Sequence, residues 1–226
     1  MSVSDAFDEW AADGRDQGME ERHWHTAKHA LERMPIEDGD GVLDLGCGSG
    51  YAARALREAA GAARAYGLDG SVKMARNARG YTDDARVGFL VGDFESLPFD
   101  SDSIDHAFSM EAIYYARDVV TALRELRRVL VPGGTFYCAV DYVADNPHTA
   151  EWDEYVDIPM THWSRNEYRE AFREAGFHVA EQDAIPDEEV EIPPADAFPT
   201  EDWDTRDAMV EHYREHGTLL TVGVVP

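Results

Sequence analysis

The chain has 226 residues, of which 44% are hydrophobic and 29% are charged. This length suffices to bury a core without disulfides or a structural metal, and the hydrophobic content excludes a wholly disordered chain. The 46 acidic residues outnumber the 20 basic ones and give a formal net charge of −26. No basic patch offsets this charge, which argues against binding to the phosphates of nucleic acids.

The acidic residues are spread along the whole chain, and Lys28 and Lys73 are its only lysines. Self-repulsion at this charge opposes a compact state in dilute buffer, and molar salt relieves it by shortening the screening length to about 3 Å. The composition resembles that of proteins from salt-accumulating halophilic archaea, so we expect a halophilic protein. An ordinary acidic cytosolic protein is the alternative.

No apolar run approaches the ~18 residues of a membrane span, and residues 1–10 are acidic, unlike a secretory signal. The two cysteines, Cys47 and Cys138, lack metal-ligand spacing and fit a reducing compartment. We therefore expect a cytoplasmic protein without membrane contact.

Residues 4–34 are predicted to be helical, with Ser4 as the N-cap and a break at Asp13. The second of these helices should cover 19–34, since Pro35 cannot continue it.

Strands and helices then alternate along the chain. The predicted strands cover 41–45, 64–68, 86–91, 103–110, 135–142, 177–184 and 219–225. The predicted helices cover 51–60, 71–79, 119–130, 164–175 and 204–216. Such alternation predicts a doubly wound α/β fold, in which ligands bind beyond the carboxyl ends of the strands.

Two segments exceed this minimal pattern. Residues 144–163 follow a strand end and are rich in aromatic and histidine residues, which suits a lid over a substrate. Residues 185–203 contain four prolines among acidic residues and are expected to cross the surface.

A glycine-rich loop, with Asp44, Gly46, Gly48 and Gly50, joins the first strand to a helix. Glycine lets the backbone approach a ligand closely, and the helix N-terminus offers N–H groups to a carboxylate or phosphate. Tyr51 stands where a dinucleotide fingerprint would need its third glycine, and the P-loop lysine is absent.

The stretch 42–50 resembles motif I of the class I S-adenosylmethionine (SAM)-dependent methyltransferases. Further stretches resemble, in the family's order, the end of its second strand, the loop after the third, motif IV, and the turn before the fifth: 67–71, 92–99, 99–109 and 126–134. On this ordered set the chain is identified as a member of the class, in the type 11 subgroup related to ubiquinone, menaquinone and sterol methylation.

The resemblance implies a doubly wound, seven-stranded Rossmann-like sheet with an antiparallel last strand and an N-terminal helical cover. It also implies a single methyltransferase domain over the whole chain. Within that domain we expect a helical cover (1–40), a SAM-binding core (41–143), a candidate lid (144–163) and the C-terminal part of the sheet (164–226).

The resemblance further implies SAM as the cofactor. By family position, Asp44 faces its amino group, Asp69 the ribose hydroxyls and Asp93 the adenine amine. The remaining implied cofactor contacts are Gly46, Gly48, Gly50, Gly70, Phe94, Ser109 and Met110. Capping of local backbone is the alternative role for Asp44 and Asp93.

The acceptor side follows the fourth strand, where Glu111, Tyr114 and Tyr115 stand. Glu111 is a candidate catalytic residue, either as a base or in orienting the substrate, or else a solvated acid at a helix start. The tyrosines are candidate substrate contacts or packing residues. Further candidates are His25 for catalysis, and His148 and His162 for substrate binding.

The expected function is methyl transfer from SAM to a small-molecule acceptor, with release of S-adenosylhomocysteine. The expected partners are that small molecule, with no nucleic acid and no membrane. No metal is expected, although Glu111, Asp141, Asp145 and Asn146 stand where some relatives bind Mg²⁺. The alternatives are a non-catalytic SAM-binding regulator, an aminopropyltransferase and a nicotinamide dehydrogenase, the last disfavoured by Tyr51.

Overall fold

The computed structural model describes residues 2–58, 61–153 and 158–226. The end of the predicted helix 51–60 and the middle of the candidate lid 144–163 fall outside these residues. Within the described part of the chain, no helix is both long and apolar enough to cross a membrane.

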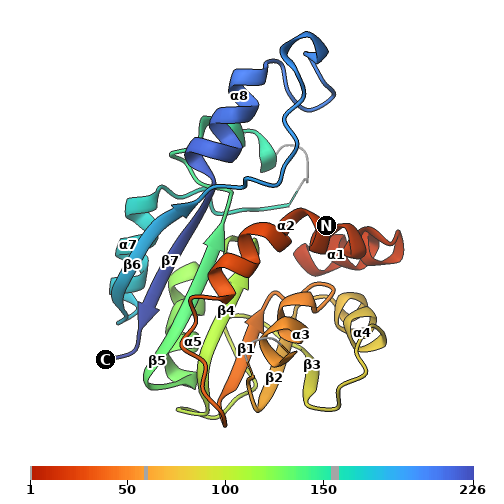
Figure 1. Ribbon diagram of the computed structural model, residues 1–226. Helices are drawn as coiled ribbons and strands as arrows, with labels where there is room; N and C mark the ends of the chain where they lie inside the picture. Colours follow the sequence, from red (N-terminus) through yellow and green to blue (C-terminus); the bar gives the residue numbers. More distant parts are fainter. Residues whose placement is uncertain (1, 59–60, 154–157) are drawn as a thin grey trace.

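A seven-stranded sheet forms the centre, with the strand order β3-β2-β1-β4-β5-β7-β6 (Figure 1). The strands are β1 (Gly41–Leu45), β2 (Arg64–Asp69), β3 (Val87–Val91), β4 (Ile104–Met110), β5 (Leu130–Val140), β6 (His178–Ile185) and β7 (Thr218–Val224). The first five run parallel, whereas β7 is antiparallel to both β5 and β6. The predicted doubly wound sheet with an antiparallel last strand is therefore confirmed.

Helices flank the sheet and cover one of its ends. Those that follow β1, β2, β4 and β5 in the chain are α3 (Tyr51–Glu58), α4 (Val72–Gly80), α5 (Val119–Val129) and α7 (Arg165–Glu174). The others are α1 (Val3–Ala12), α2 (Arg15–Leu31) and α8 (Arg206–Val210), with single turns at η1 (Ile113–Tyr115), η2 (Pro147–Thr149), η3 (Ala195–Ala197) and the π-helical η4 (Glu211–His216).

Both faces of the sheet are buried, because alternate side chains of a strand point to opposite faces. In β1, Leu43 and Leu45 pack in the cluster that includes Leu126 of α5, and Val42 packs in the one that includes Leu56 of α3. Such a scaffold holds the carboxyl ends of β1, β2 and β4 rigidly side by side.

The N-terminal helices differ from the prediction at their boundaries. Ser2, rather than Ser4, caps α1, because its hydroxyl accepts from the Asp5 N–H while the Asp5 carboxylate accepts from the Ser2 N–H. Gly14 adopts a φ of 74°, which turns the chain so that α2 begins at once, four residues before the expected start.

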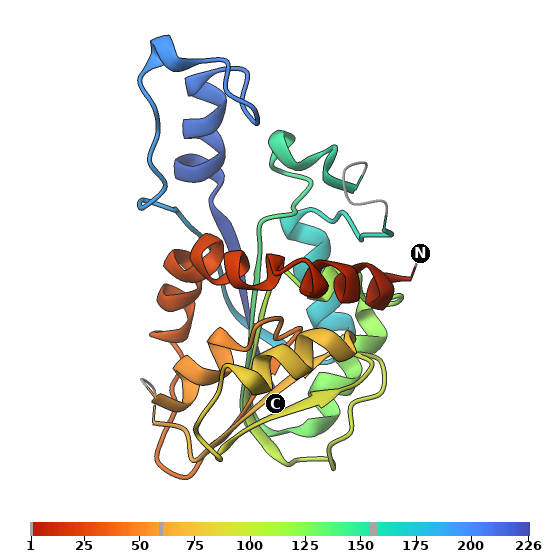
Figure 2. The same cartoon turned by 90° about the vertical axis from the view of Figure 1, so that its right-hand side faces the viewer.

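Helices α1 and α2 lie across the carboxyl ends of the parallel strands (Figure 2). Asp8 of α1 accepts from the Ser71 hydroxyl at 2.5 Å and from the Lys73 N–H at 3.0 Å, at the start of α4. Asn77 of α4 donates to the Ala11 carbonyl at 3.3 Å. These contacts attach the helical cover to the core by hydrogen bonds.

The C-terminal segment extends beyond the same end of the sheet, with α8 at its far side (Figure 1). The single helix predicted over 204–216 is divided into α8 and the π-helical η4. His212 of η4 lies 2.9 Å from the Asn146 side chain, which joins this segment to the candidate lid. Strand β5 also starts earlier than predicted, at Leu130, because its pairing with β4 passes from Leu130 to Thr135, so that the glycine turn forms an irregularity within β5.

Candidate functional site

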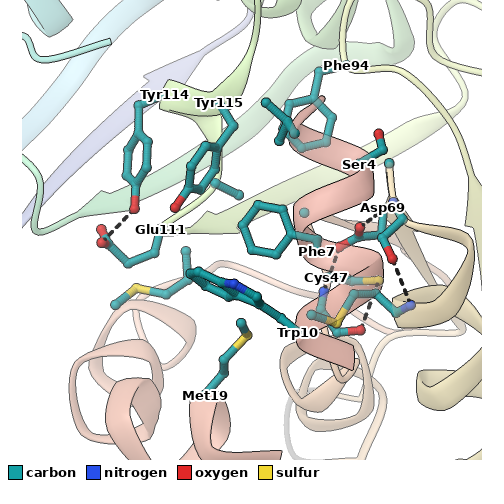
Figure 3. A pocket seen from close by; sticks show the side chains of 18 of the residues that line it. Ser4, Phe7, Trp10, Met19, Cys47, Asp69, Phe94, Glu111, Tyr114 and Tyr115 are labelled. Atoms are coloured by element: carbon teal, nitrogen blue, oxygen red, sulfur yellow. Dashed lines mark hydrogen bonds between the residues drawn. The ribbon is translucent and has the colours of Figure 1, made fainter. Parts of the chain in front are cut away.

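A cavity of about 1100 Å³ lies at the carboxyl ends of β1, β2 and β4, with α1 forming part of its wall (Figure 3). This volume exceeds the ~300–1,000 Å³ of a typical small-ligand pocket. We call the wall around Gly46, Gly48, Asp69 and Gly70 the Asp69 end, and the wall of Glu111, Tyr114, Tyr115 and Asp141 the Glu111 end. Phe7 and Trp10 lie between the two ends (Figure 3).

Gly46 brings the loop after β1 close to the start of η1. Its φ is 75°, and a Cβ added to it would lie 2.2 Å from the Cβ of Ala112. The N–H groups of Gly46 and Cys47 both donate to the Leu68 carbonyl, at 2.8 and 3.1 Å. The loop is therefore bound to the end of β2, and only glycine fits at this position.

Asp69 joins this loop to the start of α4. One carboxylate oxygen accepts from the Gly48 N–H at 2.9 Å and the other from the Ser71 N–H at 2.8 Å. Burial nevertheless raises the pKa of Asp69 above its usual value. Each oxygen retains a lone pair, so the carboxylate can accept two further donors from a ligand.

Asp44 lies deeper in the same end and is buried. One of its oxygens accepts from the Ala53 N–H of α3 at 3.0 Å, and burial raises the pKa of Asp44 to about 7. Gly50 does not line the cavity; a Cβ there would lie 2.5 Å from the ring of Phe89, so its role is close packing.

Asp93 and Phe94 line the cavity beyond β3. The Asp93 carboxylate accepts from the Glu95 N–H at 3.0 Å and from the Arg117 guanidinium at 2.7 Å. The ring of Phe94 approaches Gly46, with 3.3 Å between its Cζ and the position of an added Cβ. The two residues therefore place a carboxylate and an aromatic ring on one wall.

Glu111 occupies the turn after β4 with a φ of 51°, which is rare for a residue with a side chain. Its N–H donates to the Ala139 carbonyl at 2.9 Å, and its carboxylate accepts from the Asp141 N–H and, at 2.8 Å, from the Tyr114 hydroxyl. Burial and the neighbouring Asp141 charge hold the pKa of Glu111 well above its usual value. The pKa of Asp141 is likewise raised, to about 6, chiefly by burial.

Aromatic rings border this carboxylate pair. The ring centroids of Tyr114 and Tyr115 are 4.6 Å apart, those of Tyr115 and Phe7 are 5.0 Å apart, and those of Phe7 and Trp10 are 5.1 Å apart. Helix α1 thus contributes half of an aromatic wall whose other half comes from η1.

Most of the predicted site residues line the cavity together. They are Asp44, Gly46, Gly48, Asp69, Gly70, Asp93, Phe94, Met110, Glu111, Tyr114 and Tyr115. Ser109 is not among the lining residues; its hydroxyl is buried and has no hydrogen-bond partner within the described residues.

The three predicted histidines lie outside the cavity wall. The Nδ1 of His25 is 3.0 Å from a Glu189 carboxylate oxygen, and the Nε2 of His148 is 3.2 Å from that of Glu211. The ring of His162 stacks on a buried tyrosine at 4.2 Å. These side chains join α2, the candidate lid and the C-terminal segment to their neighbours.

Ser4, Phe7, Trp10 and Met19 line the cavity but were not predicted as site residues. The first three recur every third residue and so share a face of α1. That spacing shows a common face, but only the packing of α1 on α4 shows that the face covers the cavity.

A family model described as "Methyltransferase domain" matches residues 43–138. Over 119 residues the chain is 36% identical to methyltransferase phqN of Penicillium fellutanum, covering 51% of this chain and 35% of that protein. Over 185 residues it is 29% identical to the sterol 24-C-methyltransferase of Kluyveromyces lactis, covering 76% of this chain and 48% of that protein. The chain thus spans half or less of the length of these relatives.

Among solved structures, a chain from a complex between the Haloferax volcanii Trm112 methyltransferase activator and a methyltransferase is 65% identical. The match covers 97% of each chain with a TM-score of 0.96. The partners expected from the sequence were a small molecule, with no nucleic acid and no membrane. This prediction of partners is wrong because it includes no protein, whereas the similar chain is found in a complex with a protein.

Proposed function

The chain belongs to the class I SAM-dependent methyltransferases of type 11, and on that premise we propose that it methylates a small-molecule acceptor bound at the Glu111 end. It is an enzyme, and its cofactor is SAM. The observation that carries the proposal is one cavity with two chemically different ends, large enough for a cofactor and an acceptor together.

The Asp69 end fits the cofactor. Asp69 offers two carboxylate acceptors, which suit the two hydroxyls of a ribose. Phe94 and Asp93 suit the adenine ring and its amino group, and the backbone of Gly46 and Gly48, which lines the cavity, suits the methionine part. When bound, the cofactor supplies an electrophilic methyl group on its sulfonium.

The Glu111 end suits the acceptor because its wall combines rings with carboxylates. Trp152 and Met160 of the candidate lid 144–163 line the same cavity, and the Thr161 N–H donates to the Tyr114 carbonyl at 2.9 Å. We infer that these lid residues and Tyr115 exclude water from the acceptor, while Glu111 orients it or accepts its proton.

The test uses the whole protein with methyl-labelled SAM and a haloarchaeal metabolite extract in molar KCl. We expect calorimetry to show SAM binding, and mass spectrometry to show label in a small molecule. Label confined to protein or RNA would overturn the small-molecule acceptor. Absence of SAM binding would overturn the placement of the cofactor.

We also propose that an activator of the Trm112 type binds the edge of the sheet at β3. This edge strand has an unpaired side, and Val72, Tyr81 and Val91 beside it are 49%, 41% and 50% exposed. Open strand edges and exposed apolar side chains are typical of surfaces that bind a partner. The opposite edge, β6, is more polar, and Arg33 bridges its Glu181 and Asp183.

Size-exclusion chromatography with the Haloferax volcanii activator in molar KCl tests this surface. We expect a complex that Val72→Asp weakens about tenfold or more, because it places a charge in an apolar contact. Ala180→Asp, at an exposed position on the β6 edge, is the matched control and should leave the complex intact. The opposite order of effects would overturn the proposed surface.

The charge supports a salt-rich cytoplasm as the setting of this enzyme. Because a net charge of −26 opposes compaction unless it is screened, we expect the free energy of unfolding to rise between dilute buffer and molar KCl. Urea denaturation at several KCl concentrations measures it, and a flat dependence would contradict the halophilic assignment.

A further inference from the structure

The Glu111 carboxylate is held in the cavity wall by neutral donors alone. Its hydrogen bonds come from the Asp141 N–H and the Tyr114 hydroxyl. Within the described residues, one carboxylate oxygen of Asp141 is buried and has no hydrogen-bond partner. These two adjacent, partly buried acids have no salt-bridge partner within the described residues, although the charge of Arg22 acts on both, and a proton or a cationic ligand would stabilise them further.

The backbone at this position is strained as well. Glu111 has a φ of 51°, where residues other than glycine are rarely found. The strain directs the Glu111 side chain toward the end of β5, where its carboxylate contacts Asp141 and Tyr114 (Figure 3). A strained acid held in the wall of a cavity is typical of a functional group rather than of packing.

The rings beside these acids favour a cation. Phe7, Trp10 and Tyr115 line the cavity next to Glu111, and aromatic faces attract ammonium groups. The guanidinium of Arg15 already lies 4.5 Å from the ring centroid of Trp10. This leaves the rings of Phe7 and Tyr115 for a ligand.

The charge of the wall points the same way. Arg117 is paired with Asp93 and Glu95, at 2.7 and 2.9 Å. Burial lowers the pKa of His23 to about 4, so its imidazole is neutral. Arg15, which lies over Trp10, and Arg22 are the other lining bases of the described wall, against five lining carboxylates besides Asp93: Asp44, Asp69, Glu111, Asp141 and Asp202. A cavity of this composition disfavours an anionic acceptor and favours a cationic one.

We propose that the acceptor is an amine, whose nitrogen lies against Glu111 and Asp141 and whose carbon skeleton packs on Phe7 and Tyr115. This inference rests on the proposed function and specifies its substrate class.

The proton balance of the reaction assigns a role to Glu111. The bound ammonium first gives one proton to the Glu111 carboxylate, which frees the nitrogen lone pair. The nitrogen then gives this lone pair to the new N–C bond, the electron pair of the broken C–S bond stays on sulfur, and the product leaves as a methylammonium. Because its pKa is raised, Glu111 is a stronger base than an exposed glutamate. Tyr114 and the Asp141 N–H position it for this transfer.

The cofactor has two cationic groups of its own, an ammonium and a sulfonium. The experiment must therefore distinguish three groups that could bind Glu111: the ammonium of the cofactor, its sulfonium and the acceptor amine. Glu111→Gln keeps an acceptor for the Asp141 N–H and removes the charge. Asp141→Asn is the second variant, in case the first fails to fold. Glu189→Gln, which lies outside the cavity wall and bonds Lys28, is the matched control.

Calorimetry in molar KCl then measures the affinities of each protein for SAM and for S-adenosylhomocysteine. A second titration measures the affinity of the S-adenosylhomocysteine complex for phenethylamine or for its alcohol isostere, 2-phenylethanol. We expect Glu111→Gln and Asp141→Asn to change the affinity for either nucleoside by no more than about twofold. The affinity for phenethylamine should fall about tenfold or more, and the affinity for the alcohol should not change. The control variant should change none of the four.

Three results would overturn the inference. An equal loss of affinity for both nucleosides would show that the acids bind the ammonium, which both nucleosides carry. A loss of affinity for SAM alone would show that the acids bind the sulfonium. Equal binding of phenethylamine and 2-phenylethanol by the unaltered protein would remove amine recognition. Failure of the unaltered protein to bind SAM would instead count against the proposed function.

Discussion

The two ends of the cavity are built in different ways. The Asp69 end is formed by two short loops, which follow the neighbouring strands β1 and β2. Asp69 joins them by accepting from the backbone N–H groups of Gly48 and Ser71. At the Glu111 end, side chains from β4, β5, η1, α1 and the candidate lid meet although they are far apart in the chain.

This difference separates a general function from a specific one. Backbone geometry at the Asp69 end suits a ligand shared by many enzymes, since it depends on a few glycines and one carboxylate. Side chains at the Glu111 end can be exchanged one at a time without disturbing that geometry. The Asp69 end should therefore tolerate substitution poorly, and the Glu111 end should change specificity more readily than stability.

Gly46→Ala is expected to have the largest effect. The new methyl group would overlap Ala112, at a φ that disfavours alanine, so we expect a loss of about 3 kcal/mol in stability and loss of SAM binding. Chemical denaturation and calorimetry measure the two. Gly48→Ala, with only Met19 nearby at 3.8 Å, should cost less. Partial rescue by Ala112→Gly would confirm the overlap, and equal effects at both glycines would contradict it.

Asp69→Ala is expected to weaken SAM binding by about 1–3 kcal/mol, through loss of charge-assisted hydrogen bonds to the ribose. Asp69→Asn keeps one acceptor and should lose less. Calorimetry with SAM measures both variants, and circular dichroism checks the fold, because Asp69 also bonds Gly48 and Ser71. Unchanged affinity in a folded Asp69→Ala protein would remove this residue from the cofactor site.

Asp141→Asn tests the titration of the Glu111 end. The pKa of Asp141 is about 6 in the folded protein and about 3.9 in the unfolded chain, so the folded state binds more protons between these values. Stability should therefore fall as pH rises from about 4 to about 6, by about 1–2 kcal/mol. The variant lacks this contribution and should show a smaller decrease, because the pKa values of Glu111, Asp44 and Asp69 are raised as well; urea denaturation across that range measures it. Parallel curves for the two proteins would contradict the raised pKa.

Asp8→Ala is expected to have the smallest effect, because Asp8 does not itself line the cavity and its loss only loosens α1, which spans both ends. Loss of the hydrogen bonds to Ser71 and Lys73 should weaken SAM binding by about 1 kcal/mol and speed amide exchange over residues 3–12. Hydrogen-exchange mass spectrometry measures the second change. Unaltered exchange would show that α1 is held by its apolar contacts alone.

Local patterns determined most of the fold. The glycine loop is where the sequence predicts it. Helices α4 and α7 begin at their predicted starts, 71 and 164, where Ser71 and Ser164 are the N-caps. Strand β1 matches its predicted bounds, and the alternation of elements predicted the doubly wound sheet. These features depend on residues close in the chain, so the sequence pattern predicts them without any knowledge of how the elements pack. The wall residues of the Asp69 end were predicted from the resemblance of 42–50 and 67–71 to the motifs of the family.

Tertiary packing decided the rest. Nothing in the spacing of Phe7 and Trp10 shows that their face of α1 covers the cavity, and the ring of His25 is directed to Glu189 by a segment more than a hundred residues away. The pairing of Glu111 with Asp141 likewise depends on β4 and β5 being neighbours in the sheet. Contacts between distant segments are set by how whole faces pack together, and a periodic pattern gives the face but not its partner.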